Sequence, residues 1–114
     1  MEDSFLRPIV GRCLGGVCFV MNCVELHFND AVLTALNPLT VSAGGKFWAR
    51  DEAGWRDALC ARIGRTVKSA SNSESGLIIN LDDAATLTLS LRSEDFAGPQ
   101  AFNFTSPGDP TIVG

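Results

Sequence analysis

Long apolar runs are missing from this sequence of 114 residues. None approaches the roughly 20 residues that a helix needs to cross a bilayer, so we expect no membrane span. The first residues place two acids ahead of a short apolar stretch that Arg7 and Pro8 interrupt. A secretory signal instead begins with bases and continues with an unbroken apolar core. We therefore expect a cytoplasmic protein.

Basic residues are also scarce, because 9 Lys and Arg stand against 13 Asp and Glu, a formal net charge of -4. From residue 71 onward Arg92 is the only base. A surface that holds a phosphate backbone needs the opposite sign, so we expect neither nucleic acid nor an anionic membrane as a partner. With 46% hydrophobic and 19% charged residues, the chain predicts one folded domain over residues 1–114.

Recognisable metal and redox motifs are absent. The cysteines are Cys13, Cys18, Cys23 and Cys60. Their spacing matches neither paired C-x-x-C zinc ligands nor a C-x-x-C redox motif. We therefore expect buried free thiols, no disulfides and no cofactor.

An internal repeat organises the sequence. With an offset of 53 residues, Gly11-Arg12 aligns with Gly64-Arg65, and Asp30-Ala31 aligns with Asp83-Ala84. Between these identities the apolar positions agree, since Leu14, Val24, Leu26 and Phe28 fall on Val67, Leu77, Ile79 and Leu81. Each half therefore predicts a short segment ending in Gly-Arg, two strands, a turn and a further strand.

The strand pattern is clearest in the second half. Apolar residues alternate over residues 77–81 and 87–91, which predicts two strands that pack on a core from one side. Residues 82–85 predict the hairpin between them. In the first half, residues 17–28 predict a strand that is covered on both faces at its start, and Asn29-Asp30 predicts the turn after it.

A helix is predicted between the halves, from about Glu52 to Ile63. Apolar residues recur there every four positions from Trp55, Asp51 can cap its start, and Gly64 provides a left-handed end. The predicted fold class is α+β, with two pseudo-repeated three-stranded antiparallel β units and this central helix on the sheet. A small closed or half-closed β-barrel is the alternative. We expect residues 104–114 to form a loosely ordered tail or to lie against a neighbour.

Three motifs follow one another in the second half: IGRTV at 63–67, LIINLDD at 77–83 and SLRSEDFAGPQ at 90–100. They resemble a family of small uncharacterised bacterial proteins, in which an I-G-x-x-V strand precedes an L-x-F-x-D-G hairpin and an S-L-R-x-E-D-[FY]-x-G-P-E ending. Ala84 stands where the hairpin glycine is usual, and Gln100 stands where the ending has Glu. The resemblance implies no activity.

Cys23, Glu25 and His27 are the first candidates for chemistry. Alternate residues of a strand share one face, with the outer two groups about 13 Å apart and neighbours about 7 Å apart. A thiol, a carboxylate and an imidazole at this spacing fit a nucleophile with its base or a partial metal site. Their counterparts in the second half are Gly76, Ile78 and Asn80. Since no orienting group or oxyanion donor is visible, we favour a polar strand face.

Aromatic and basic residues ahead of the helix form the second candidate site. Phe47 and Trp48 lie beside Lys46 and Arg50, and aromatics next to arginine are enriched among interface hot spots. Trp48 and Arg50 are therefore candidate binding residues. Capping of one end of the core is the favoured alternative for either ring alone.

These features favour a non-catalytic protein-interaction module over an enzyme. We expect its partner to be another protein or a second copy in a homodimer, because the 2 Trp and 7 Phe of so small a chain leave apolar surface for a partner. The alternative is a small-ligand-binding or enzymatic domain that uses a pocket near Glu25 and His27.

Overall fold

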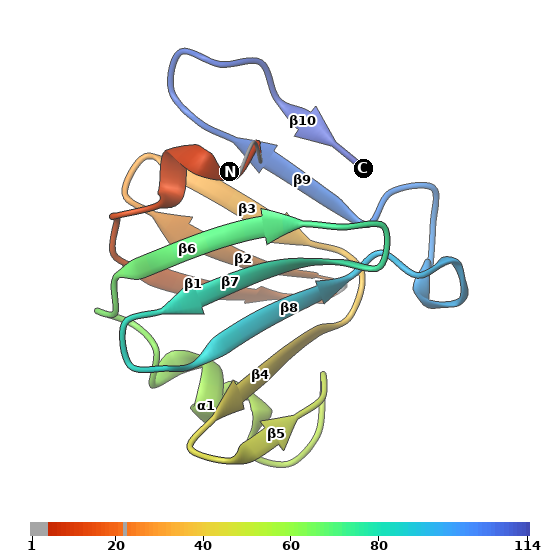
Figure 1. The fold of residues 1–114 in the computed structure, drawn as a ribbon. Helices are drawn as coiled ribbons and strands as arrows, with labels where there is room; N and C mark the ends of the chain where they lie inside the picture. The colour runs from red at the N-terminus through yellow and green to blue at the C-terminus, as the bar shows by residue number, and fades with distance from the viewer. Residues whose placement is uncertain (1–4, 22) are drawn as a thin grey trace.

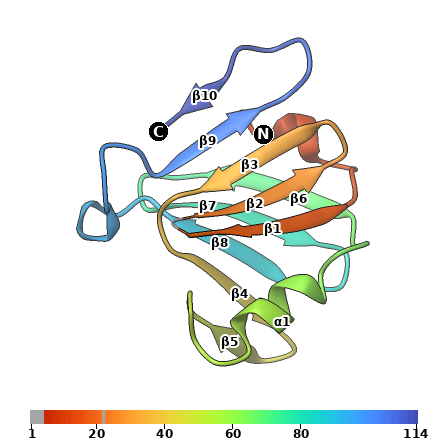
Figure 2. The same cartoon turned by 180° about the vertical axis from the view of Figure 1, so that it is seen from behind.

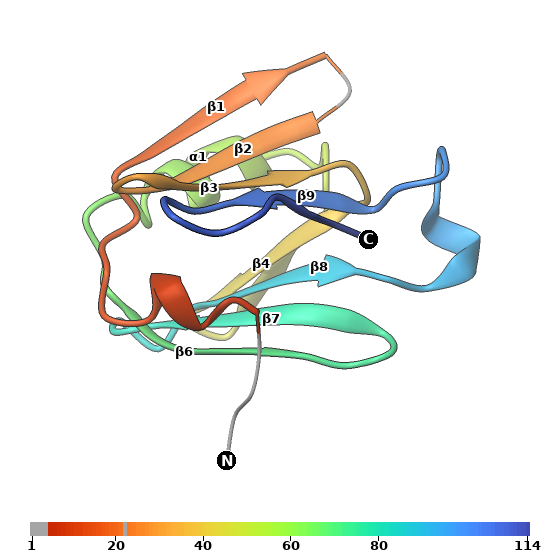
Figure 3. The same ribbon diagram turned by 90° about the horizontal axis from the view of Figure 1, so that it is seen from above.

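Two five-stranded antiparallel sheets pack face to face in this protein (Figure 1, Figure 3). The structure, a computed structural model, describes residues 5–21 and 23–114. The chain is mostly antiparallel β with one short α-helix, and its sheets do not close on themselves. The small β-barrel that the sequence left open is therefore not formed. In the described residues no helix has the length and apolar character needed to cross a membrane.

The first sheet has the strand order β1-β2-β3-β9-β10. These strands are β1 (Gly16–Val20), β2 (Cys23–Phe28), β3 (Ala31–Ala35), β9 (Phe102–Thr105) and β10 (Ile112–Val113). Period-two alternation buries one face of the sheet, as in β2, where Val24, Leu26 and Phe28 are buried. Asn29 has a φ of 60° in the β2–β3 turn, at the position predicted from the sequence.

The second sheet has the strand order β5-β4-β8-β7-β6. These strands are β4 (Leu39–Ala43), β5 (Lys46–Trp48), β6 (Val67–Asn72), β7 (Gly76–Leu81) and β8 (Thr86–Ser90). The predicted hairpin of β7 and β8 is confirmed, with Leu77 opposite Leu89 and Ile79 opposite Leu87. Its turn holds Ala84 at a φ of 67°, where a glycine is more usual.

Both halves of the chain contribute strands to both sheets. The meander β1–β2–β3 lies in the first sheet, and the meander β6–β7–β8 lies in the second. After its third strand each half crosses to the opposite sheet, so that β4 pairs with β8 and β9 pairs with β3. Each sheet therefore consists of three strands from one half and two from the other.

Four backbone hydrogen bonds join the segments that precede β1 and β6. They run from Gly11 N to Val67 O, from Gly64 N to Leu14 O, from Leu14 N to Arg65 O and from Val67 N to Arg12 O, at 2.7–2.9 Å. The first two bonds form one pair and the last two form another. In each pair, adding 53 to the donor's residue number and subtracting 53 from the acceptor's turns the first bond into the second. Cys13 and Thr66, also separated by 53 residues, form the bridge between them.

The helix is shorter than the sequence predicts. It is α1 (Trp55–Cys60), and no side chain caps its start, so Asp51 is not its cap. Asp51 and Gly54 have φ values of 67° and 89°, and left-handed residues cannot continue a right-handed helix. Trp55 is buried, as expected, and donates from Nε1 to Leu39 O over 2.8 Å. This bond docks α1 onto β4.

Residues 17–28 form two strands instead of one. The strand β1 ends at Val20, and β2 begins at Cys23 and pairs with it antiparallel. The apolar residues at both odd and even positions of residues 17–20 therefore belong to an edge strand. Its outward side chains Cys18 and Val20 are exposed. The expected burial of the thiols is also wrong, because Cys13, Cys18 and Cys60 are exposed and Cys23 is only partly buried.

Candidate functional site

Cys23, Glu25 and His27 lie on the outer face of the first sheet, on β2. Glu25 Oε1 is 3.1 Å from His27 Nε2, and the two side chains are 36% and 40% exposed. The two pockets described below are lined by other residues. Within residues 5–21 and 23–114, no three His, Cys, Asp or Glu side chains gather as metal ligands.

Trp48 and Arg50 lie where β5 ends and the chain turns toward α1. Trp48 is partly buried, and a Cβ atom on Gly54 would be 3.0 Å from its Nε1 atom. This approach is tighter than most Cβ contacts, so Trp48 packs closely against this turn. Arg50 reaches away from the turn and donates from Nη1 to Leu36 O over 3.1 Å. The structure thus gives the two candidate residues different neighbours.

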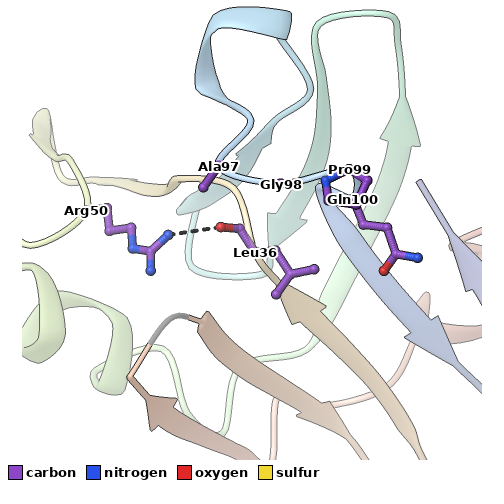
Figure 4. Close-up of a pocket in the computed structure, with 6 residues that line it drawn as sticks. All are labelled: Leu36, Arg50, Ala97, Gly98, Pro99 and Gln100. Atoms are coloured by element: carbon purple, nitrogen blue, oxygen red, sulfur yellow. Dashed lines mark hydrogen bonds between the residues drawn. The ribbon is translucent and has the colours of Figure 1, made fainter.

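Arg50 forms one wall of a pocket of about 400 Å³. The lining residues are Leu36, Arg50, Ala97, Gly98, Pro99 and Gln100. Figure 4 shows Arg50 on one side, Gln100 on the other and Leu36 between them. They come from three segments: the β3–β4 crossover, the turn after β5, and the loop that leads into β9. We call this region of the molecule the crossover end.

The charge of Arg50 is only weakly offset. Its Nε is 3.9 Å from Asp51 Oδ2, and the Asp51 side chain is 74% exposed. A guanidinium has five N–H donors, and Leu36 O occupies one Nη1 donor. The Arg50 side chain is 24% exposed, so most of it is buried where it lines the pocket. Leu36, Ala97 and Pro99 supply an apolar lining beside this charge.

A second hollow lies on the other side of the β3–β4 crossover. It has a volume of about 410 Å³ and is lined by Pro38, Thr40, Phe47, Ser75, Thr88, Ser90, Arg92 and Asp95. Phe47 is 63% exposed there, so its ring does not cap the core. Leu36 lines the first hollow and Pro38 lines the second. Residues 36–38 therefore separate two recesses of different character.

The two crossovers differ in length, and this difference builds the pocket. The β3–β4 crossover has 3 residues, 36–38, whereas the β8–β9 crossover has 11 residues, 91–101, with the 3-10 helix η2 (Ser93–Asp95) inside it. Long loops between strands of a compact domain often carry function. Sequence reasoning singled out Arg50 as a binding residue, named residues 97–100 only as part of a motif, and missed Leu36. The available signal was the length of the Gly-Pro loop.

Comparisons of the chain with models of protein families, with curated proteins and with solved structures found no significant match. The geometry of the crossover end is therefore what bears on function.

Proposed function

We propose that the protein is a non-catalytic interaction module that binds a carboxylate group of a partner protein at the crossover end. One observation carries this proposal: the guanidinium of Arg50 is held by Leu36 O at the wall of an apolar-lined pocket. Arginine binds carboxylates through paired N–H donors in a planar arrangement. An apolar residue that carries a carboxylate, such as the last residue of a protein chain, complements both features.

The lining of the pocket favours binding over catalysis. Among the described residues that line it, only Arg50 and Gln100 have polar side chains, and none is an Asp, Glu, His, Cys or Ser that could act as base or nucleophile. The exposed ring of Phe47 lies nearby in the second hollow. Aromatic and arginine side chains of this kind are the usual anchors of protein interfaces.

The pocket is tested with a small apolar carboxylate. Benzoate is titrated into nitrogen-15-labelled protein and followed by NMR, with benzamide as the uncharged probe. We expect benzoate to shift the backbone amide signals of Leu36, Arg50, Ala97, Gly98 and Gln100. Replacing Arg50 by glutamine should weaken benzoate binding roughly tenfold or more, because a hydrogen bond to a charged group contributes about 1.5–3 kcal/mol.

The control is Arg56→Gln, since Arg56 lies on α1 and outside the pocket lining. This variant should bind benzoate as the unchanged protein does. Equal shifts by benzamide, or unchanged binding by Arg50→Gln, would contradict the proposal.

We further propose that the chain is a tandem duplication of one β motif. The support is the strand order of the two sheets. Replacing β1, β2 and β3 by β6, β7 and β8, and β9 and β10 by β4 and β5, turns the order β1-β2-β3-β9-β10 into that of the second sheet. The exchanged hydrogen bonds at an offset of 53 residues support the same proposal. The structure that both halves share then maintains the fold, and the proposed binding residues lie where the halves differ.

A reducing compartment such as the cytoplasm is proposed for the same protein. The support is that all four cysteines are free and three of them are exposed, a state that oxidising compartments do not favour.

A further inference from the structure

The strand β1 forms an open edge of the first sheet. It is the terminal strand in the order β1-β2-β3-β9-β10. Figure 3 shows it at the outer rim of the molecule, and Figure 2 shows the first sheet in front of the second, with α1 lower in the view. Its five residues, GVCFV, include no charged residue and no proline. An uncharged apolar edge leaves backbone N–H and C=O groups available for another strand.

The other three sheet edges are protected in ways that β1 is not. The strand β6, which occupies the equivalent place in the second sheet, carries Lys68 and has a register shift between Val67 and Ser69. The strand β5 has 3 residues and begins with Lys46, and β10 has 2 residues. Lysines, bulges and short length are the devices that prevent edge pairing. Their absence from β1 marks this edge as different.

We propose that β1 pairs antiparallel with β1 of a second copy of this chain, about a two-fold axis at Cys18. The two first sheets then form one continuous ten-stranded sheet, five strands from each copy. Such a contact uses the same patch on both copies, so it closes as a dimer and does not extend into a filament. This surface is separate from the Arg50 pocket and adds a second role to the proposed interaction function.

The sequence of β1 is complementary to itself in this register. Full overlap about Cys18 places Gly16 opposite the partner's Val20 and Gly15 opposite the partner's Met21. Val20 and Met21 are 49% and 92% exposed, whereas a Cβ atom on Gly16 would meet nothing within 4 Å. Large exposed side chains at one end of the strand therefore face open space at the other. Alternation of large and small residues is what packs facing positions well.

The inner face of the edge is already supported. Val17 and Phe19 point inward and are partly buried, and full overlap places each opposite the other across the axis. The Phe19 ring lies edge-on to Trp55, with centroids 5.6 Å apart, and Arg56 lies 4.9 Å over it. Phe19 is thus held in place before a partner arrives, which reduces the ordering cost of association.

The acidic residues of the first sheet do not oppose the pairing. Glu25 is the acidic residue nearest the axis along the sheet, because it lies opposite Cys18 on β2. In the dimer the two Glu25 positions are three strand spacings apart, about 14 Å. This distance exceeds the Debye length of about 8 Å at physiological salt.

Sedimentation equilibrium of the full chain at micromolar concentration tests the dimer. We expect the unchanged protein to be dimeric and Cys18→Lys to dissociate more readily, because this substitution places two lysines opposite each other and weakens association about fivefold. The matched control is Ser71→Lys, which changes the position 53 residues later on the edge strand β6. It should remain dimeric. Circular dichroism should show cooperative unfolding for both variants.

Thiol cross-linking tests the register. Directly opposite residues of antiparallel strands have Cα atoms about 4.5–5.5 Å apart, within the range that a disulfide spans. With copper-phenanthroline as oxidant, the unchanged protein should yield a covalent dimer, and Cys18→Ser should not. A monomeric unchanged protein, a dimer that Cys18→Lys does not weaken, or a covalent dimer retained in Cys18→Ser would overturn the proposal. None of these outcomes affects benzoate binding at Arg50.

Discussion

Replacing Phe104 by alanine is expected to reduce the free energy of unfolding by about 3–5 kcal/mol. The Phe104 side chain is 1% exposed, and its residue pairs with Leu33 across β9 and β3. The Phe5 ring lies 6.0 Å from it, centroid to centroid. Truncation leaves a cavity at the point where the second half of the chain joins the first sheet. Equilibrium unfolding in urea, followed by tryptophan fluorescence, measures the loss.

Phe47→Ala provides the matched control for this prediction. Phe47 is 63% exposed at the crossover end, so its removal should change the free energy of unfolding by no more than about 0.5 kcal/mol. A loss as large as that of Phe104→Ala would show that the Phe47 ring belongs to the core and does not serve as an exposed binding residue.

Asp83→Ala is expected to cost about 2–3 kcal/mol of stability. Asp83 accepts hydrogen bonds from Arg62 Nη1 at 2.9 Å and from Ala85 N at 3.1 Å, and Arg65 Nε lies 3.7 Å away. The side chains of Arg62 and Asp83 are each only 17% exposed. Without the carboxylate, the Arg62 charge stays largely buried with no counter-charge, and its Nε has no partner even in the intact protein. Urea unfolding again measures the effect.

The exposed ion pair of Arg92 and Glu94 is the control for Asp83. These side chains are 59% and 63% exposed, and exposed pairs contribute little because water screens them. Glu94→Ala should therefore change stability by about 0.5 kcal/mol or less. If Asp83→Ala changed stability as little as Glu94→Ala does, the Arg62–Asp83 pair would have no stabilising role.

Local sequence patterns predicted the β7–β8 hairpin and the β2–β3 turn. The alternation over residues 77–91 fixed which residues of β7 and β8 face the core, and Asn29 was correctly expected in a turn. The same reasoning failed at β1 and β2, because Met21, exposed in the connection between them, is an apolar residue and extends the apolar run of β1. It also predicted too long a helix for α1. Because acidic residues commonly cap helices, the sequence did not indicate that Asp51 adopts a left-handed conformation.

Those local patterns did not predict which distant strands pair. The sequence gives no local indication that β4 leaves the first sheet to pair with β8, or that β9 returns to pair with β3. The pocket depends on these crossings, because they bring Leu36 and the Gly98-Pro99 loop beside Arg50. Arg50 was therefore recognisable as a candidate from its residue type, whereas its neighbours were not.

The exchange of strands between the two halves of the chain is tested most directly by separating the halves between residues 53 and 54, ahead of α1. Each fragment then lacks the strands that complete its sheet, so neither 1–53 nor 54–114 should unfold cooperatively as a monomer. An equimolar mixture should recover the NMR spectrum and the cooperative urea transition of the intact chain. A monomeric fragment that unfolds cooperatively by itself, or a mixture that stays unfolded, would contradict the interlocked arrangement.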